Sequence, residues 1–281
     1  MQHTFSLHKI NHSEHFDFSP ADYSRFKFGD TIAARSFGVE LAKAFIEKIL
    51  MKIAVPKQMV VISSPYSFIP TATFALKDYF VFTLNRWLAE NEHAVVQETR
   101  VHRTITYKED YGALDAEQRM NLIGGDSFHI DKDFLAGKTL LFLDDIKITG
   151  SHERMITKML TEYGLQNETY LLYFAELENK MIHPNIENYL NYYFVKSIFD
   201  LEGIVKSDSF AMNTRLVKYI LNADHNEFKF FIQNQSSEFM NRLYDLALGN
   251  GYHTIEAYQP NLNKLRLYLS SSFKAENLLG N

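Results

Sequence analysis

Apolar residues recur along this chain in two patterns that predict different secondary structures. Spacings of three and four residues between about Ser24 and Ile53 predict a long helix, which Pro56 ends. A second helix is predicted from Pro70 to Glu90, because proline suits the first turn. Short continuous apolar runs predict strands instead, and the first two of them predict buried strands. These runs cover residues 59–62, 139–143, 170–174 and 192–198.

The order of these elements predicts an α/β protein with a Rossmann-like parallel sheet. A helix at 151–163, ended by Gly164, follows the strand at 139–143, so strands and helices alternate. Residues 201–281 carry helical apolar patches and lack strand signals. We therefore divide the chain into a polar N-terminal arm at 1–20, an α/β domain at 21–200 and a mostly helical C-terminal region at 201–281.

Other segments give weaker signals. Residues 95–105 look extended, and residues 115–123 fit a short helix because Asp115 and Gln118 match a capping box. The first twenty residues hold four histidines but no apolar face that would support a metal-binding helix. We expect this arm to be a mobile tail.

The composition indicates a soluble protein with a sizeable core. Hydrophobic residues make up 46% of the chain, and the formal net charge is −5, without the basic excess of a nucleic-acid binder. No cysteine is present, which excludes disulfides, thiolate catalysis and cysteine zinc sites. The N-terminus has no apolar signal core, and no apolar run reaches the roughly 18 residues of a membrane span. We therefore expect a cytoplasmic protein with no membrane or nucleic-acid partner.

The segment Leu140–Ser151, LLFLDDIKITGS, places two adjacent carboxylates at the end of a predicted buried strand. Ligands of open parallel sheets bind beyond the carboxyl ends of the strands. The loop after Asp145 feeds a helix N-terminus, whose unpaired N–H groups and dipole favour an anion. Asp144 and Asp145 can therefore accept hydrogen bonds from ribose hydroxyls while residues 146–151 wrap a 5-phosphate. The alternative is an ordinary strand end with Ser151 as the N-cap of the helix.

The same segment resembles the phosphoribosyl pyrophosphate (PRPP) motif of type I phosphoribosyltransferases. That motif is an apolar run followed by two acids, two variable positions, a threonine and small residues. The flanking sequence resembles the branch of the family that is related to competence protein F. The residues that carry this second likeness are Tyr23–Asp30, Arg103, Leu114–Leu122, Phe128 and Gly137–Leu140. The resemblance covers about residues 20–200.

The resemblance implies a reaction in which a nucleophile displaces pyrophosphate from the anomeric carbon of PRPP, with Mg²⁺ neutralising the leaving group, or the reverse reaction, which removes phosphoribosyl from an unidentified acceptor. It implies that Asp144 and Asp145 bind the ribose hydroxyls, directly or through the metal. It places the 5-phosphate on Lys147, Ile148, Thr149, Gly150 and Ser151. It places the pyrophosphate on Ser63, Ser64, Tyr66 and Ser67. A mobile flap at 100–113, which carries Arg103, would close over the ligand. Family members often dimerise, so a homodimer is also implied.

One departure from the family pattern keeps a second function open. Residues 63–73 include no basic side chain where the related branch carries Arg-Gly-Phe-Asn, and the first cation is Lys77. Cations of the flap can supply the missing charge on closure, Arg103 before Arg100. The alternative is a non-catalytic module that senses PRPP or a nucleotide and acts through residues 201–281. A phosphatase or kinase fits less well, since the chain has no Gly-x-x-x-x-Gly-Lys loop and its two aspartates are adjacent.

Overall fold

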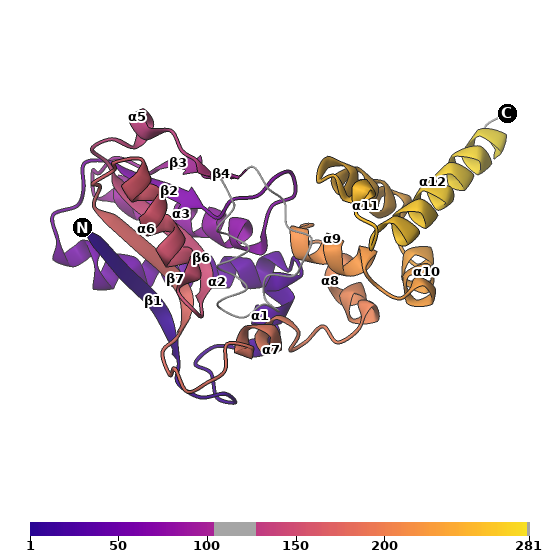
Figure 1. Ribbon diagram of the computed structural model, residues 1–281, viewed down its shortest axis with the longest axis horizontal. Coiled ribbons are helices and arrows are strands. Elements are labelled where there is room, and N and C mark those ends of the chain that lie inside the picture. The colour runs from indigo at the N-terminus through magenta and orange to yellow at the C-terminus, as the bar shows by residue number, and fades with distance from the viewer. Residues whose placement is uncertain (104–127, 280–281) are drawn as a thin grey trace.

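A computed structural model describes residues 1–103 and 128–279 of the chain. Five strands form one parallel sheet in the order β1-β7-β6-β2-β3 (Figure 1). The strands are β1 Gln2–Ile10, β2 Met59–Ser63, β3 Gln97–Arg100, β6 Thr139–Lys147 and β7 Thr169–Leu177. A short antiparallel pair consists of β4 His102–Arg103 and β5 Phe128–His129. The predicted α/β class with a parallel sheet is confirmed.

Strand β6 extends beyond its neighbour β2 at the carboxyl edge of the sheet. Ser63, the last residue of β2, pairs with Leu143 of β6 and with Arg100, the last residue of β3. Beyond that point β6 continues beside β7, through residues 144–147. The sequence indicated a strand that ends at Leu143, but beyond it β7 pairs with Asp144, Ile146 and Lys147. The two carboxylates therefore lie at the step where β2 ends and β6 continues.

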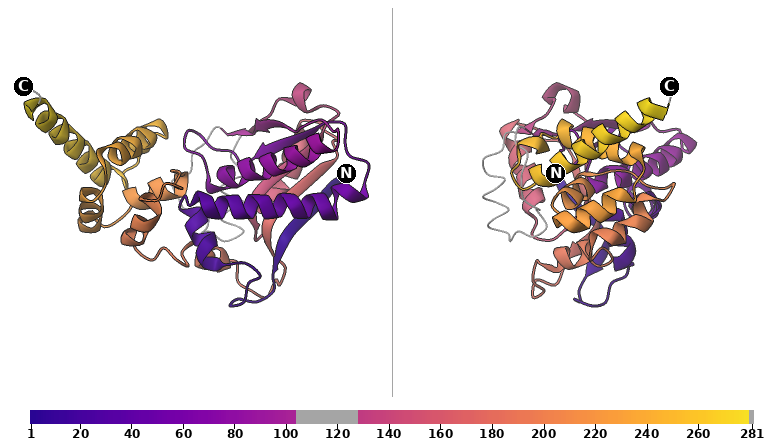
Figure 2. Two further views of the ribbon diagram at one scale, coloured as in Figure 1. Left: turned by 180° about the vertical axis from the view of Figure 1, so that it is seen from behind. Right: turned by 90° about the vertical axis from the view of Figure 1, so that its right-hand side faces the viewer.

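Helices cover both faces of the sheet. The helices α2 Thr31–Lys48 and α3 Ala72–Glu90 lie against one face (Figure 2), where their apolar side chains form the main core with the strands. The helix α6 Ser151–Glu162 and the short α5 Lys132–Leu135 pack against the other face. The predicted helices after β2 and β6 are confirmed, and Gly164 adopts the left-handed conformation expected just beyond α6.

The first predicted helix is divided into two. Helix α1 Pro20–Lys27 is separated from α2 at Gly29, which has a φ of +100°. A side chain at Gly29 would also clash with the chain, since a Cβ there would lie 2.3 Å from the carbonyl oxygen of Ala211. Asp30 then caps the N-terminus of α2 through its side chain. The helical spacing on both sides of this break concealed it in the sequence.

The N-terminal segment is a strand and not the mobile arm that the sequence indicated. Strand β1 pairs with β7 over Gln2–Ile10, at the edge of the sheet. Phe5 and Leu7 pack against the main core, whereas the Ser6 hydroxyl donates to Glu176 of β7. This alternation is typical of a strand with one solvated face. Because many residues of this strand are polar, the sequence did not distinguish it from the polar residues that follow it.

The predicted strand at 192–198 is wrong. Helix α7 Ile186–Asn191 ends just before it, and the 3-10 helix η3 Ile198–Leu201 follows. Val195 and Ile198 are buried among the C-terminal helices, so these β-branched side chains reflect burial and not a strand. The fifth strand of the sheet is β1 instead.

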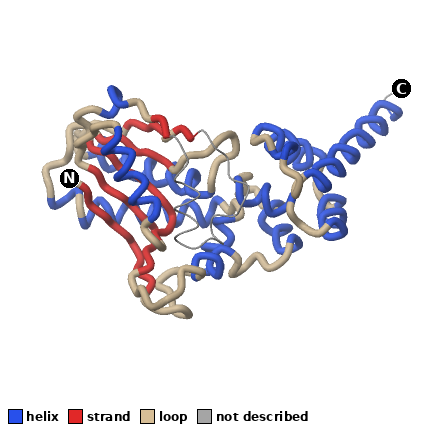
Figure 3. The backbone as a smooth tube through the Cα atoms, in the orientation of Figure 1, coloured by secondary structure: helices blue, strands red, loops and turns tan. Residues whose placement is uncertain are grey.

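The C-terminal region is helical, as expected (Figure 3), and has a core of its own. We call α8 to α12 the helical unit. Its helices are α8 Glu202–Val205, α9 Thr214–Leu221, α10 His225–Gln233, α11 Ser237–Gly249 and α12 Gln259–Leu279. Phe28 and Ile69, which precede this region by more than a hundred residues, are fully buried in its core. The boundary at residue 200 stays a prediction. Among the described residues, no helix is long and apolar enough to cross a membrane.

The ring of His8 in β1 packs among aromatic rings. Its centroid lies 5.4 Å from that of Phe18 and 4.8 Å from that of Phe174. Its Nε2 atom is buried without a hydrogen-bond partner in the described part of the chain. Burial lowers the pKa of His8 below its ordinary value, although Glu40 and Asp17 oppose this shift. The folded state therefore resists protonation of this ring.

We predict that His8→Phe reduces the loss of stability in acid. The unfolded chain protonates His8 below about pH 6.5, whereas the folded chain does so only at lower pH, so stability falls as the pH falls through this window. Urea denaturation at pH 7 and pH 5 should show a smaller decrease for His8→Phe than for the parent. His12→Phe, a change of an exposed histidine, should behave like the parent. Equal decreases in all three proteins would contradict the assignment.

Candidate functional site

Asp144 lies at the step between β2 and β6, next to the N-terminus of α6. Its Oδ2 atom is 2.5 Å from Nδ1 of His152, the second residue of α6. Its Oδ1 atom accepts hydrogen bonds from the backbone N–H of Asp145 at 3.0 Å and from the hydroxyl of Ser64 at 3.4 Å. Burial alone would lower the pKa of His152, but the Asp144 carboxylate raises it above its usual value. Asp144 is therefore the point where β6, α6 and the loop after β2 meet.

The neighbouring Asp145 is buried and is bound by three side chains of the protein. Lys27 of α1 forms an ion pair with its Oδ2 atom, and the Tyr23 hydroxyl donates to the same oxygen at 2.5 Å. Thr73 donates to Oδ1 at 3.1 Å. Burial by itself would raise the pKa of Asp145, but Lys27 and the Tyr23 hydroxyl hold it well below its usual range. The charge of Asp145 is therefore neutralised inside the protein.

The two aspartates differ in their exposure to solvent. Mg²⁺ usually keeps several waters and takes one or two protein carboxylates together with phosphate oxygens of a substrate. The side chain of Asp144 is 14% exposed and borders the solvent. Asp145 is buried and already accepts from the ammonium group of Lys27 and the hydroxyls of Tyr23 and Thr73. The described residues contain no cluster of three metal-binding side chains. An ion here would be held by Asp144 and by oxygens of the bound ligand.

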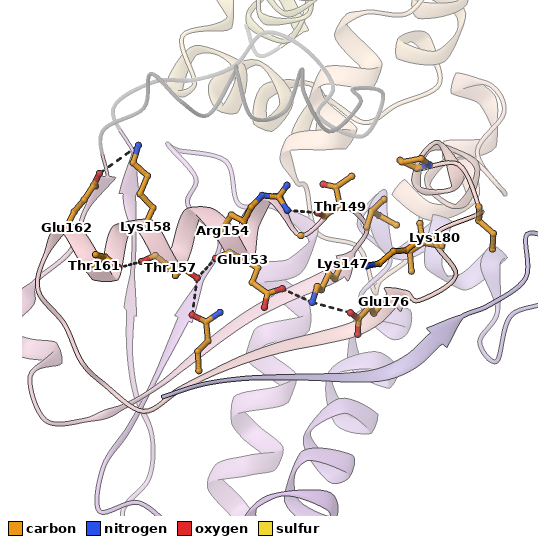
Figure 4. Close-up of a pocket in the computed structure, with 16 residues that line it drawn as sticks. Lys147, Thr149, Glu153, Arg154, Thr157, Lys158, Thr161, Glu162, Glu176 and Lys180 are labelled. Carbon is orange, nitrogen blue, oxygen red and sulfur yellow. Dashed lines mark hydrogen bonds and ion pairs between the residues drawn. The ribbon is translucent and has the colours of Figure 1, made fainter.

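Residues 147–151 form a tight turn into α6. Gly150 has a φ of +69°, a left-handed conformation that favours glycine. The hydroxyl oxygens of Thr149 and Ser151 are 2.7 Å apart. The Arg154 guanidinium donates to the Thr149 carbonyl at 2.9 Å (Figure 4) and to Ser151 Oγ at 3.1 Å. Arg154 holds the turn from the side of α6, at a helix N-terminus whose dipole favours an anion.

The predicted phosphate-binding residues do not all belong to this turn. Lys147, the last residue of β6, forms ion pairs with Glu153 at 2.6 Å and Glu176 at 3.1 Å (Figure 4). These three side chains line a groove that runs along α6. Ile148 packs against the main core. The positions at the helix N-terminus are therefore those of residues 149–151.

The loop after β2 brings hydroxyl groups and a cation to the same edge of the sheet. Ser63 is buried at the end of β2, and the hydroxyl of the next residue, Ser64, donates to the carboxylate of Asp144. Tyr66 and the exposed Ser67 follow in the loop. The guanidinium of Arg100 lies 5.2 Å from the ring centroid of Tyr66. Because Arg100 is exposed, its charge faces the solvent beside this loop.

The other predicted cations are placed differently. Arg103 lies in β4, where its backbone pairs with β5. The rest of the predicted flap, residues 104–113, lies outside the described residues, as does the helix expected at 115–123. Lys77 is buried and forms an ion pair with Glu98 of β3, so its charge is already neutralised.

The side chains of this site that the sequence analysis missed are Tyr23, Lys27 and His152. Lys27 and Asp145 are 118 residues apart, so no spacing along the chain connects them. His152 had a signal, because a helix that begins at residue 151 places its second residue near the end of the preceding strand. Arg100 was ranked below Arg103. Arg100 is the last residue of β3 and pairs with Ser63 at the end of β2, so its position favours it over Arg103 as the cation beside the loop.

A family model matches most of the chain. The model is described as PRTase ComF-like, where PRTase stands for phosphoribosyltransferase, and it matches residues 1–265. Among curated proteins, none matches the chain.

Several solved structures are similar to part of the chain at low sequence identity. A Staphylococcus aureus hypoxanthine phosphoribosyltransferase is 11% identical, and the match covers 52% of this chain and 66% of that one with a TM-score of 0.34. The chain therefore spans slightly less than two thirds of that relative. A Trypanosoma cruzi hypoxanthine phosphoribosyltransferase is 18% identical, with 54% and 69% covered and a TM-score of 0.33. An adenine phosphoribosyltransferase is 17% identical, with 50% and 68% covered and a TM-score of 0.30.

The family match extends from β1 through the PRPP-like motif and into the last helix of the helical unit. It therefore includes both the α/β sheet and the helices that follow it. On this ground the protein belongs to the ComF-like family of phosphoribosyltransferases.

Proposed function

We propose that this protein binds PRPP with Mg²⁺ at the carboxyl edge of β2 and β6 and transfers the phosphoribosyl group to an acceptor. The observation that carries the proposal is the hydrogen bond from Ser64 to Asp144, because it joins the loop after β2 to the first acid of the motif. Membership of the ComF-like family supports an activity of the phosphoribosyltransferase type. The homodimer and the cytoplasmic location stay predictions from the sequence.

PRPP has three polar parts, and each has a matching partner at this edge of the sheet. The 5-phosphate fits the turn at 149–151, where the N–H groups and the dipole of α6 favour an anion. The ribose hydroxyls fit Asp144, which accepts hydrogen bonds when it is ionised. The pyrophosphate fits the hydroxyls of residues 63–67 and the charge of Arg100. These partners adjoin one another because Ser64 contacts Asp144.

In the proposed reaction a nucleophilic atom of the acceptor forms a bond to the anomeric carbon of PRPP. The bond from that carbon to the pyrophosphate oxygen breaks, pyrophosphate leaves with the electron pair, and the acceptor releases a proton to solvent. Mg²⁺ bound with PRPP would neutralise part of the charge on the leaving group. Asp144 would orient the ribose, and residues 149–151 would hold its phosphate. Arg100 would stabilise the charge that develops on the departing pyrophosphate.

Asp145 has a different part in this proposal. Its carboxylate already accepts from Lys27, Tyr23 and Thr73, and it is buried. We assign Asp145 to holding the end of β6 against α1, so that Asp144 keeps a fixed position at the solvent edge.

A second candidate function is a non-catalytic sensor of PRPP or of a nucleotide. Residues 63–67 carry no basic side chain of their own, and Lys77 is paired with Glu98. A sensor would bind PRPP through Asp144 and the turn at 149–151 but would release no pyrophosphate. Pyrophosphate released above background during incubation with a panel of nitrogen bases and amines would exclude this function.

Replacing the exposed acid should weaken PRPP binding. Asp144→Asn loses the charge-assisted hydrogen bonds to ribose, so we expect an increase in Kd of about tenfold or more in a calorimetric titration of PRPP with MgCl₂. Asp245→Asn, which neutralises an exposed aspartate on α11, is the matched control and should bind like the parent. No PRPP binding by the parent would refute the proposed function. Unchanged binding by Asp144→Asn would refute the site.

Replacing the cation beside the loop should affect one part of the ligand. Arg100→Gln removes the charge next to residues 63–67, so we expect the Kd of Mg-pyrophosphate to rise about tenfold while that of ribose 5-phosphate stays unchanged. The control is Arg86→Gln, a change of an exposed arginine on α3. A proportionate loss of affinity for both ligands would contradict this role of Arg100.

Breaking the buried ion pair should destabilise the fold. Lys27→Met leaves Asp145 buried without its cation, so we expect a loss of about 3–5 kcal/mol in the free energy of unfolding, measured with urea. The double change Lys27→Met/Asp145→Asn should recover part of this loss. Lys9→Met breaks an ion pair with Glu176 at the sheet edge and should cost no more than about 1 kcal/mol. Equal costs for the two lysine changes would contradict this account.

A further inference from the structure

The helical unit holds the loop after β2 through the side chain of Asn250, at the end of α11. Its Oδ1 atom accepts from the backbone N–H groups of Phe68 at 2.9 Å and Ile69 at 3.0 Å. Its amide nitrogen donates to the hydroxyl of Tyr252 at 2.9 Å. Tyr252 is fully buried in the core of the helical unit. The side chain of Asn250 is therefore held in place and accepts hydrogen bonds from the backbone of the loop at two successive residues.

Further contacts attach the same end of the loop to the helical unit. Ile69 is fully buried in the core of the unit. The Thr214 hydroxyl donates to the Ile69 carbonyl at 2.7 Å, and its backbone N–H donates to the Pro70 carbonyl at 2.9 Å. The loop between β2 and α3 thus starts on the sheet and is anchored on the helical unit before α3 begins.

The ring of Phe68 in the loop packs closely against Gly249, the last residue of α11. A Cβ atom on Gly249 would lie 2.2 Å from Cδ1 of the Phe68 ring, which no side chain can tolerate without a shift. The Phe68 ring is 56% exposed, so it has open space into which it can move. A side chain at position 249 would therefore displace the ring of Phe68, the residue whose backbone N–H donates to Asn250.

We propose that Asn250 and Gly249 are positioning residues for the pyrophosphate part of the site. They act through the backbone of residues 68 and 69 and set where Ser64, Tyr66 and Ser67 lie. The helical unit thereby positions a loop of the proposed ligand site. A loop already held in its binding conformation loses less entropy on binding, and a displacement of about 1 Å can cost about a hundredfold in rate. This inference rests on the proposed function, because it assumes that residues 63–67 bind pyrophosphate.

Gly249→Ala tests the inference without removing any hydrogen-bonding group. Alanine favours a helix over glycine, so the substitution should not weaken α11 itself, while its methyl group meets the Phe68 ring. Gly203→Ala in α8 is the matched control, because a Cβ at that position has no atom within 4 Å. Both variants and the parent are titrated with Mg-pyrophosphate and, separately, with ribose 5-phosphate. Thermal unfolding is recorded for each protein.

We expect Gly249→Ala to raise the Kd of Mg-pyrophosphate about tenfold or more while the Kd of ribose 5-phosphate changes less than about twofold. Gly203→Ala should bind both ligands like the parent. Unchanged pyrophosphate binding by Gly249→Ala would overturn the inference and leave the proposed function standing. An equal loss for both ligands would also overturn it, because that result indicates a general structural defect. A parent that binds neither ligand would overturn the proposed function as well.

Asn250→Ala provides a second measurement that does not depend on the methyl group. It leaves the N–H groups of Phe68 and Ile69 without their acceptor, and the same selective loss of pyrophosphate affinity is expected. Asn241→Ala, on the exposed side of α11, is its control. A fall in the melting temperature of Asn250→Ala with unchanged affinity for pyrophosphate would assign Asn250 to structure alone and would overturn the inference.

Discussion

The buried ion pair between Lys27 and Asp145 is the interaction on which the geometry of the site depends. Two charges removed from water are tolerated when they neutralise each other, and either one alone would be a large penalty. The pair joins the end of β6 to the end of α1. The residue after Lys27 is Phe28, which is buried in the helical unit, and Asn213 donates to the Lys27 carbonyl at 3.1 Å. Strand β6, helix α1 and the helical unit are therefore joined at two successive residues, Lys27 and Phe28.

The two acids of the motif lie in different surroundings, although the Thr73 hydroxyl is within hydrogen-bond distance of both carboxylates. Successive side chains of a strand point to opposite faces. Asp145 faces the side of the main core, where Tyr23 and Lys27 enclose it, whereas Asp144 faces α6 and contacts His152. Two neighbouring carboxylates thus meet one dry and one partly wet environment. Under the proposed function, Asp145 is a counter-ion inside the protein and Asp144 is an acceptor at its edge.

The sequence predicted those parts of the molecule that depend on local patterns. For example, strands β2 and β6 can be predicted from their own apolar runs. The turn at 149–151 can be predicted from its local sequence as well. Strand β1 was missed because an edge strand with one polar face resembles a polar tail. The partners of Asp145 could not be predicted, since Lys27 meets it only when α1 packs on the sheet. The importance of Arg100 depends on strand register, which places it beside Ser63.

The two buried residues Phe28 and Ile69 tie the folding of the helical unit to the completion of the site. Each belongs by sequence to the α/β domain and by packing to the core of the unit. Without the unit, both side chains would be exposed and the adjoining segments, one with Lys27 and one with the loop after β2, would lose their anchors. Without the α/β domain, the unit would lack two of its fully buried side chains. Burial of such side chains contributes roughly 1.5–3 kcal/mol each, a large share of ordinary domain stability. We therefore expect the two parts to fold as one cooperative body.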